Sequence, residues 1–254
     1  MIHSTAIVEP GARLGANVSV GPWSYIGADV EIGDNCVIGP HVVVRGPTRM
    51  GQGNRVFQFS SIGEDCQDKK YAGEPTELII GDNNVFREST TIHRGTIQDN
   101  SLTQIGNDNL FMAYVHVAHD CMIGDHNILA NATTLAGHVH VGDYVILGGF
   151  TGVHQFCKIG SHAFTAVSSV VVQDVPPYVM AQGHNAVPRT INSEGLRRRG
   201  FSAEQIKTIK RAYKMLYRQG LTLSDALQQM RVMGAPELDS LIRFIEQSQR
   251  GIIR

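Results

Sequence analysis

The stretch Phe111-Met-Ala-Tyr-Val-His-Val117-Ala-His-Asp-Cys-Met-Ile123-Gly-Asp-His-Asn-Ile-Leu129 carries a large apolar residue at every sixth position. The same period of six extends over most of the chain, from Val8 to Ile62, from Ile80 to Ile92 and from Ile105 to Val171. Thr165 is the one member of this series that is not apolar. Neither the helical period of 3.6 nor the strand period of two generates such spacing. The chain therefore consists mainly of a repeated six-residue unit, whose apolar member is called the anchor below.

Each six-residue unit is long enough for one short strand and one turn. Three units make a coil of 18 residues, and coils stacked about 4.8 Å apart form a three-sided prism. The repeat predicts a mainly β fold, a parallel β-helix solenoid whose handedness the period alone does not give. The residue after the anchor is often glycine, as at Gly33 and Gly142. We interpret these glycines as recurring bends with positive φ.

The fourth residue after each anchor is always Ala, Val, Ser, Thr, Cys or Asn. All four cysteines occupy this position, namely Cys36, Cys66, Cys121 and Cys157. No two of them form a CxxC pair, which metal and redox sites commonly use. The pattern predicts that the cysteines are small buried side chains rather than metal ligands or redox centres.

Two insertions interrupt the period of six. The interval from Ile62 to Ile80 is twelve residues longer than one unit, and the interval from Ile92 to Ile105 is seven residues longer. We expect loops over residues 64–79 and 98–104 that leave the prism at the same corner. Loops on a rigid scaffold commonly carry binding and catalytic residues.

The repeat ends near Pro176-Pro177, and the remaining chain has helical character. Ser202 with Gln205 is typical of a capping box that opens a helix, and Gly220 suits its C-terminal end. The helices that we predict span about residues 193–199, 203–218, 222–233 and 236–249. We therefore divide the chain into a β-helix over residues 1–178 and an α-helical C-terminal domain over residues 179–254.

Composition and charge narrow the classes of function. The net charge is −1 and 18% of residues are charged, which gives no overall reason to bind nucleic acid or an anionic membrane. No apolar run is long enough to span a bilayer, and the first ten residues lack the features of a signal peptide. These features favour a cytoplasmic protein with reduced cysteines and no transmembrane segment.

Histidines gather on the predicted face whose anchors include Ile92, Val117, Leu135 and Val153. The side chains that we assign to this face are His93, His119, His138, His140, His154 and Gln155, with His116 just before the corner. The stacking of coils brings several of them together. An ordinary surface histidine is the simplest interpretation of each one, and a zinc site made by His116 and His119 with His93 or His138 is another.

His119 has the features of a general base. Asp120 follows it directly, and a carboxylate can fix the tautomer of an imidazole and raise its basicity. Gly137 lies 18 residues, or one coil, after His119. A glycine there lets its backbone N–H approach a ligand closely and stabilise an oxyanion.

A basic segment follows the repeat. Between Arg189 and Arg218 there are nine basic and two acidic residues, a net charge of +7. A solvated helix face would explain it, and so would an anionic partner such as a nucleotide pyrophosphate or an acidic carrier protein. Nucleic acid is disfavoured because aromatic residues do not alternate with the basic ones. No glycine-rich nucleotide fingerprint stands between a strand and a helix.

Several segments together resemble a known family. They are Gln67-Asp-Lys-Lys-Tyr-Ala-Gly-Glu-Pro75, Thr91-Ile-His-Arg-Gly-Thr96, His116-Val-Ala-His-Asp120, Leu135-Ala-Gly-His138, Val153-His-Gln-Phe156, Asp174-Val-Pro-Pro-Tyr178 and Asn192-Ser-Glu-Gly-Leu-Arg-Arg-Arg-Gly-Phe201. With them the chain resembles, over nearly its whole length, the UDP-N-acetylglucosamine O-acyltransferases of lipid A biosynthesis. The resemblance implies a left-handed parallel β-helix that works as a homotrimer, with sites in the clefts between prisms. It implies no cofactor and no metal.

The resemblance also implies an activity and roles for residues. The activity is transfer of an (R)-3-hydroxyacyl group from acyl carrier protein to the 3-hydroxyl of UDP-N-acetylglucosamine, without a covalent acyl-enzyme. His119 would be the general base, Asp120 would orient it, and the Gly137 N–H would serve the oxyanion. The residues that would bind substrate are Asp68, Lys70, His93, His116, His138, Gln155, Asn192, Glu194, Arg198 and Arg199. The basic helices would dock the acidic carrier protein.

One position in the resemblance bears on acyl-chain length. Val167 lies where family members have a residue that bounds the acyl groove, and its branched side chain predicts a shorter acyl chain than glycine would allow. The turn Gln182-Gly-His-Asn-Ala186 departs from the order expected in the family, so contacts of His184 and Asn185 are left open.

Three other functions compete with this interpretation. The N-acyltransferase of the same pathway carries an additional N-terminal uridine-binding domain, whereas here the repeat begins by Val8. A trimeric zinc hydratase on the same fold would hold stoichiometric zinc. A purely structural or ice-binding solenoid would have flat, repetitive faces rather than irregular loops and a histidine cluster.

Overall fold

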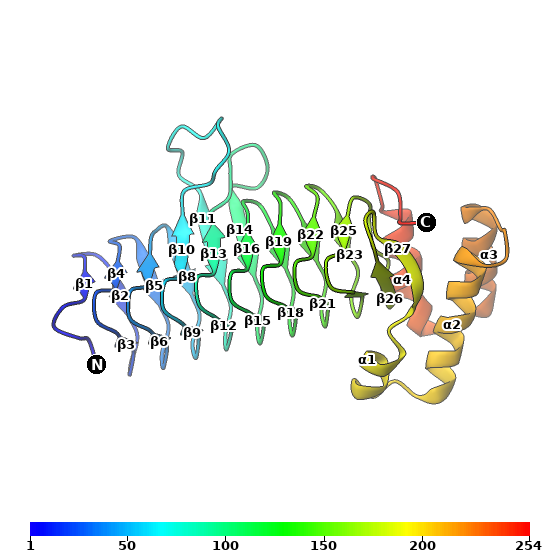
Figure 1. The fold of residues 1–254 in the computed structure, drawn as a ribbon, viewed down its shortest axis with the longest axis horizontal. Coiled ribbons are helices and arrows are strands. Elements are labelled where there is room, and N and C mark those ends of the chain that lie inside the picture. The colour runs from blue at the N-terminus through cyan, green and yellow to red at the C-terminus, as the bar shows by residue number, and fades with distance from the viewer.

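The computed structural model describes residues 1–254 and forms an elongated prism with helices at its C-terminal end (Figure 1). Its strands fall into three sheets, and consecutive strands from β1 to β25 belong to the three sheets in rotation. Sheet 1 contains β1 (Ile7–Val8), β4 (Tyr25–Ile26), β7 (Val43–Val44), β10 (Ser61–Glu64), β13 (Thr91–His93), β16 (His116–Val117), β19 (Thr134–Leu135), β22 (Gly152–Val153) and β25 (Val170–Val171). Sheet 2 contains β2 (Arg13–Leu14), β5 (Val30–Ile32), β8 (Thr48–Met50), β11 (Glu77–Ile80), β14 (Leu102–Ile105), β17 (Met122–Ile123), β20 (His140–Val141) and β23 (Lys158–Ile159).

Sheet 3 contains β3 (Ser19–Val20), β6 (Val37–Ile38), β9 (Arg55–Val56), β12 (Val85–Phe86), β15 (Leu110–Phe111), β18 (Ile128–Leu129), β21 (Ile146–Leu147), β24 (Phe164–Thr165), β26 (Val179–Gln182) and β27 (Val187–Ile191). All pairs are parallel except β26 with β27. The architecture is a left-handed parallel β-helix with C-terminal helices, as the sequence resemblance implies.

The anchors fill the interior of the prism, as the period predicts. Val117 pairs with Leu135, and Leu135 pairs with Val153, so anchors 18 residues apart lie directly above one another. The rings of Phe86 and Phe111 stack with their centroids 4.8 Å apart in the same interior column. Each anchor therefore packs against its counterparts in the coils above and below, which keeps its apolar surface from water.

The prediction about the glycines that follow the anchors was wrong in its physical reason. Of the glycines that directly follow an anchor, Gly63 alone has a positive φ, and positive φ occurs instead at the third residue after the anchor, as at Asn17, Asn35 and Asp120. The glycines are needed because adjacent coils approach closely there: a Cβ atom on Gly33 would lie 2.7 Å from the carbonyl carbon of Gly51. Close backbone approach between coils, rather than a left-handed bend, selects glycine at this position.

The predicted burial of the cysteines is confirmed. All four are buried and none forms a disulfide. Burial raises the pKa of the Cys121 thiol to about 12 and that of Cys157 to about 11. Neither thiol is ionised to a useful degree at neutral pH, so both act as small interior side chains.

Both insertions lie where the chain passes from sheet 1 to sheet 2. Residues 65–76 connect β10 to β11, and residues 94–101 connect β13 to β14. In Figure 1 the two connections project from the same side of the prism. They are called loop 1 and loop 2 below.

The C-terminal part begins with two strands that extend sheet 3. β26 stacks on β24, and β27 returns antiparallel to β26, both beyond residue 178, where the sequence pattern predicts the prism to end. The helices are α1 (Ser193–Arg198), α2 (Ala203–Tyr217), α3 (Leu223–Met233), the 3-10 turn η1 (Pro236–Leu238) and α4 (Asp239–Glu246). The predicted capping box of Ser202 and Gln205 is present. None of the helices has both the length and the apolar character required to cross a membrane.

Candidate active site

His119 and Asp120 form the turn that leads from sheet 1 to sheet 2, directly after β16. Asp120 is the third residue after the anchor Val117 and adopts a φ of 58°. Asp and Asn tolerate this left-handed conformation better than most residues. The turn places the two side chains side by side, with His119 Nδ1 at 2.8 Å from Asp120 Oδ2. An Nδ1–H that donates to this carboxylate leaves the Nε2 lone pair of His119 free.

Asp120 is held from three further directions. Its Oδ1 accepts from the Thr96 backbone N–H at 2.9 Å, and its Oδ2 accepts from the Thr96 hydroxyl at 2.6 Å. Its own N–H donates to Thr103 Oγ1 at 2.8 Å. Burial alone would raise the pKa of Asp120, but the hydrogen bonds from His119 and Thr96 outweigh it and hold that pKa below its ordinary value. The group is therefore a carboxylate at neutral pH although only 2% exposed.

Gly137 lies directly beside the ring of His119. A Cβ atom on Gly137 would lie 2.5 Å from His119 Cε1 and 2.7 Å from Nε2. Gly137 is buried, and its N–H donates to no atom of the chain. Gln155 occupies the same place one coil further on, because β16, β19 and β22 pair in register. The ring of His119 occupies the space that a side chain at Gly137 would fill, so the free Nε2 of His119 and the free N–H of Gly137 lie close together at a place called the notch below.

His138 follows Gly137 and is the second imidazole at this corner. Its ring packs edge-on against His119 and stacks on Phe156 with centroids 4.3 Å apart. Its Nδ1 lies 3.0 Å from Asp99 Oδ2 in loop 2, and its Nε2 lies 3.9 Å from Asp120 Oδ2. Loop 2 thereby supplies a carboxylate that orients His138, as Asp120 orients His119.

His93 and His116 form a second pair on sheet 1, next to the first. Their rings meet edge to face with centroids 5.0 Å apart, and His116 Nδ1 bonds to Thr91 Oγ1 at 2.8 Å. Burial, together with the neighbouring His116 and His119, lowers the pKa of His93 to about 4. Burial also lowers the pKa of His116. Both imidazoles are neutral at pH 7 and can donate and accept hydrogen bonds.

The donor set could be considered for a metal ion, because ligand atoms of His119, Asp120 and His138 lie within 4.8 Å of one another. The carboxylate of Asp120, however, already accepts from two Thr96 donors and from His119. A metal would have to displace these bonds. The arrangement fits an oriented base better than a preformed metal site.

Other predicted site residues do not contact this cluster within one chain. In loop 1, Asp68 Oδ1 accepts from the N–H of Lys70, whose side chain is exposed. Loop 1 is tied down near His93 by Arg94, whose buried guanidinium donates to Gly63 O, to Asp65 and to the Tyr71 hydroxyl. Loop 1 therefore projects from the same corner of the prism that carries His119.

The group predicted to receive a nucleotide lies at a different corner, between sheets 2 and 3. Asn192 caps α1 through Gly195 N–H and donates its amide to His162 O. Glu194 pairs with Arg198 at 3.1 Å, and Arg199 lies over the ring of Tyr144 at 4.7 Å. Val167 lies at the third corner, between sheets 3 and 1, where it is 67% exposed. One chain therefore presents its predicted site residues on separate corners.

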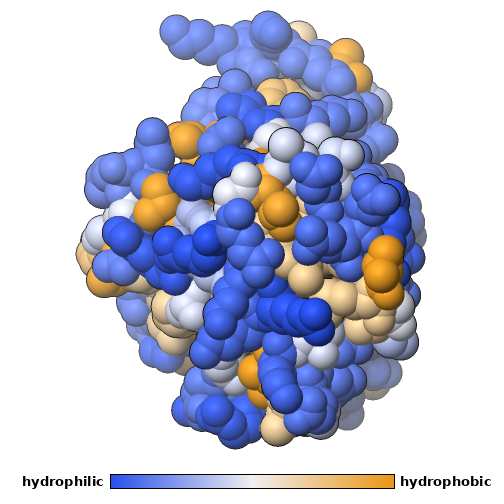
Figure 2. Space-filling view, turned by 90° about the vertical axis from the view of Figure 1, so that its right-hand side faces the viewer, coloured by the Kyte–Doolittle hydropathy of each residue, from blue (hydrophilic) through white to orange (hydrophobic).

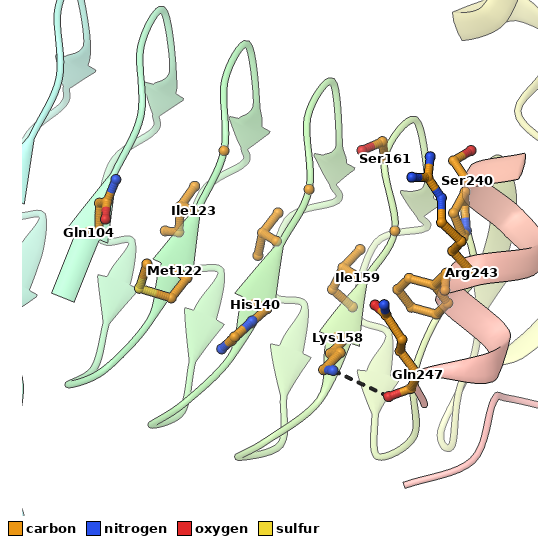
Figure 3. A pocket seen from close by; sticks show the side chains of 16 residues that line it. Gln104, Met122, Ile123, His140, Lys158, Ile159, Ser161, Ser240, Arg243 and Gln247 are labelled. Carbon is orange, nitrogen blue, oxygen red and sulfur yellow. Dashed lines mark hydrogen bonds between the residues drawn. The ribbon is translucent and has the colours of Figure 1, made fainter. Parts of the chain in front are cut away.

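The assignment of His140 to the histidine face was wrong. His140 lies in β20 and belongs to sheet 2. It points into a groove between sheet 2 and α4, together with Lys158, Arg243 and Gln247 (Figure 3). The error arises because each strand is only two residues long. The chain turns within a few residues of the anchor Leu135, so that His140, five residues after it, already begins a strand of the next sheet.

The sequence pattern did not single out Thr96, Thr103 or Asp99, which hold Asp120 and His138. A signal for the two threonines was present, since Thr96 is the fourth residue after Ile92 and Thr103 the second before Ile105. Thr96 lies near the start of loop 2, and Thr103 lies in β14 just after it.

Comparisons with known proteins agree with this geometry. The model described as "Udp N-acetylglucosamine O-acyltransferase; Domain 2" matches residues 174–253, and the bacterial transferase hexapeptide model matches residues 11–46 and 102–137. The acyl-[acyl-carrier-protein]--UDP-N-acetylglucosamine O-acyltransferase of Herminiimonas arsenicoxydans is 58% identical over 100% of this chain and 99% of its own length.

Two solved structures are similar over the whole chain. LpxA from Acinetobacter baumannii has 51% identity and a TM-score of 0.97, with 100% of this chain and 99% of that one covered. The UDP-N-acetylglucosamine acyltransferase of Francisella novicida has 44% identity and a TM-score of 0.98, with 100% and 94% covered. Together with the hexapeptide coils and the stacked histidine corner, these matches show that the chain belongs to the UDP-N-acetylglucosamine O-acyltransferase family.

Proposed function

We propose that this chain is an acyltransferase that moves an (R)-3-hydroxyacyl group from acyl carrier protein to the 3-hydroxyl of UDP-N-acetylglucosamine. The reaction is the first step of lipid A biosynthesis, and we place it in the cytoplasm. Family membership supports the reaction class. The single observation that carries the mechanism is the notch at Gly137, which holds the free Nε2 of His119 and an unpaired backbone N–H together.

The base in this mechanism is His119. Asp120 accepts from Nδ1–H, so Nε2 takes the proton of the sugar hydroxyl as that oxygen attacks the thioester carbonyl carbon. The negative charge moves to the carbonyl oxygen, and the Gly137 N–H donates to it. The intermediate collapses when the carbon–sulfur bond breaks, and the proton on His119 passes to the departing thiolate of the carrier.

No covalent acyl-enzyme is needed in this scheme. The four cysteines are buried, and burial holds the pKa of Cys157 at about 11, so it is a poor nucleophile at neutral pH. The imidazoles of His93, His116 and His138 would line the sugar pocket with Gln155. Asp68 and Lys70 would reach the sugar and acyl groups from loop 1.

We further propose that the working form is a homotrimer. His119 lies at the corner between sheets 1 and 2, whereas Asn192, Arg198 and Arg199 lie beside the corner between sheets 2 and 3. A neighbouring copy can bring these two corners together across a cleft, and closed cyclic symmetry repeats the same contact three times. Uridine diphosphate bound by the second group would then present its sugar to His119 of the first.

An exposed aromatic row supports contact between copies. Trp23, Phe59, Tyr114 and Phe150 are 63%, 62%, 68% and 66% exposed. All four are the third residue after an anchor of sheet 3, so they lie along the corner between sheets 3 and 1. Exposed aromatic side chains gathered along one corner are typical of a protein interface. Val167 lies on the same corner, where it would bound the acyl groove between two copies.

The carrier protein would dock by charge at the C-terminal end. The basic residues of α2 on this side include Lys207, Lys210, Arg211 and Lys214, all exposed. Figure 2, which faces the end that carries the helices, shows a mostly hydrophilic surface with hydrophobic residues in small separate groups. Such a surface favours electrostatic steering of an acidic partner over burial of a large apolar area.

The direct test is acyl transfer from 3-hydroxyacyl carrier protein to UDP-N-acetylglucosamine by the purified protein. We expect His119→Ala to lower kcat by at least about 10²-fold, the usual scale for loss of a general base. Activity close to that of the unaltered protein would remove His119 from this role. The metal content of the same sample is measured as a second test. If the protein holds stoichiometric zinc and loses activity without it, the mechanism is contradicted.

A subunit-mixing experiment tests whether sites are shared between copies. His119→Ala and Arg198→Ala are each expected to be nearly inactive alone. Co-expression should restore up to about a quarter of the sites, because random mixing pairs an intact His119 with an intact neighbouring Arg198 in that share of clefts. No recovery in mixed oligomers would contradict a site built by two subunits.

A further inference from the structure

We propose that Thr96 is a positioning residue that, with Thr103 across the neck of loop 2, holds the Asp120 carboxylate in the orientation that His119 requires. The inference rests on the proposed function. It gives the second insertion a role beyond the contact of Asp99 with His138.

Because of the insertion, one position of the six-residue unit occurs twice, once before and once after the inserted residues. In an uninterrupted unit the fourth residue after one anchor is also the second residue before the next. The insertion separates these two places, so that Thr96 lies near the start of loop 2 and Thr103 lies in β14, just after the loop. Both are buried, and both bond Asp120 in the coil above: Thr96 donates to the carboxylate, and Thr103 accepts from the Asp120 N–H.

The neck of the loop is closed by a close backbone contact. A Cβ atom on Gly95 would overlap the backbone nitrogen of Leu102, so the two ends of loop 2 lie against each other only because residue 95 is glycine. This contact between the ends of loop 2 places Thr96 and Thr103 next to Asp120.

The geometry at Oδ2 explains why the hydroxyl matters. Oδ2 accepts from Thr96 Oγ1 at 2.6 Å and from His119 Nδ1 at 2.8 Å, while Oδ1 accepts from the Thr96 N–H. Two donors from one residue fix the plane of the carboxylate. The ring of His119 then keeps its Nδ1–H tautomer and points Nε2 at the notch of Gly137. Without the hydroxyl, the carboxylate keeps one Thr96 donor and can rotate about it.

Other ionisable groups around Asp120 must be considered when the pair is titrated. His138 Nε2 lies 3.9 Å from Oδ2, and the charge of Asp120 acts on Cys66 of loop 1. His119 itself is the third group. Because these groups lie close to the same carboxylate, the acidic limb of a pH–rate profile is read for the cluster rather than for one residue.

The experiment compares Thr96→Val, which removes the hydroxyl at nearly constant volume, with Thr96→Ser, which keeps it. Thr90→Val is the matched control, because Thr90 is also buried and donates a 2.7 Å hydroxyl bond, to Arg87 O at another corner. We expect Thr96→Val to lower kcat about 10-fold with little change in KM, the low end of what loss of orientation costs. Its acidic limb should move to higher pH, because the carboxylate loses a bond that favours its charged form. Thr96→Ser should restore both.

A second readout does not depend on activity. Selective ¹⁵N-histidine spectra of the full chain, with His119 assigned by comparison with His119→Gln, report its tautomer. We expect the Nδ1–H form in the unaltered protein and in Thr96→Ser, and a mixture in Thr96→Val; Thr96→Ala takes its place if Thr96→Val does not fold. A loss of kcat equal to that of Thr90→Val, an unmoved acidic limb or an unchanged tautomer would overturn the proposal. Absence of acyl transfer in the unaltered protein would instead refute the proposed function, while the spectra would still test the positioning.

Discussion

The substitution Gly137→Ala tests the notch most directly. The added Cβ atom would lie 2.5 Å from His119 Cε1 and 2.7 Å from Nε2, whereas ordinary carbon contacts are about 3.5–4 Å. The ring must therefore move by about 1 Å, and its 2.8 Å bond to Asp120 lengthens or breaks. A displacement of about 1 Å at a reacting group costs about 10²-fold in rate. This corresponds to about 2.7 kcal/mol of lost transition-state stabilisation.

The assay is steady-state acyl transfer, with melting of the same samples followed in parallel. Gly152→Ala is the matched control, because Gly152 lies one coil further along sheet 1 and a Cβ there meets nothing within 4 Å. We expect Gly137→Ala to lose about 10²-fold in kcat while Gly152→Ala keeps its activity. The backbone N–H survives in both variants, so the loss would measure the position of His119. Turnover of Gly137→Ala within about threefold of the unaltered protein, with the fold intact, would refute the reasoning.

Three further predictions follow from the same structure. The pKa of His93 is lowered from 6.5 to about 4, so the neutral buried imidazole costs no stability above pH 6.5, and the free energy of unfolding falls as the pH drops towards 4. Urea denaturation at pH 7 and pH 4.5 measures this fall, which should be about 2–3 kcal/mol smaller in His93→Gln than in the unaltered protein. Gly33→Ala should lower stability by about 1–3 kcal/mol, seen as a lower melting temperature, because its Cβ would press on the Gly51 backbone of the next coil; an unchanged melting temperature would contradict the close approach. Val167→Gly should shift preference towards longer acyl donors in a mixed-donor assay, and an unchanged preference would remove Val167 as the boundary of the groove.

The fold was readable from the sequence because it is a sum of nearly identical local steps. Away from the two insertions, each anchor pairs with the anchors 18 residues before and after it, so a period of six fixes both the strand and its neighbours. The buried cysteines followed for the same reason. The role of the glycines did not, because their close approach to the next coil is a property of stacking that one coil does not contain. His140 was misplaced because a two-residue strand leaves no margin for locating a corner.

The candidate site likewise contains residues that the repeat places and residues that only the folded structure places. Residue types and the spacing of 18 were enough to place His119, Gly137 and Gln155 in one column, because that spacing is the coil itself. The hydrogen bonds that orient the column come from Thr96 and Asp99, which reach it through loop 2, a segment outside the repeat. Where the period of six is uninterrupted, residues 18 apart in the sequence lie above one another, so the sequence alone determines their positions. Where it is interrupted, only the folded chain decides which hydrogen-bond partners reach Asp120 and His138, because the path of an insertion depends on the contacts that it makes in space.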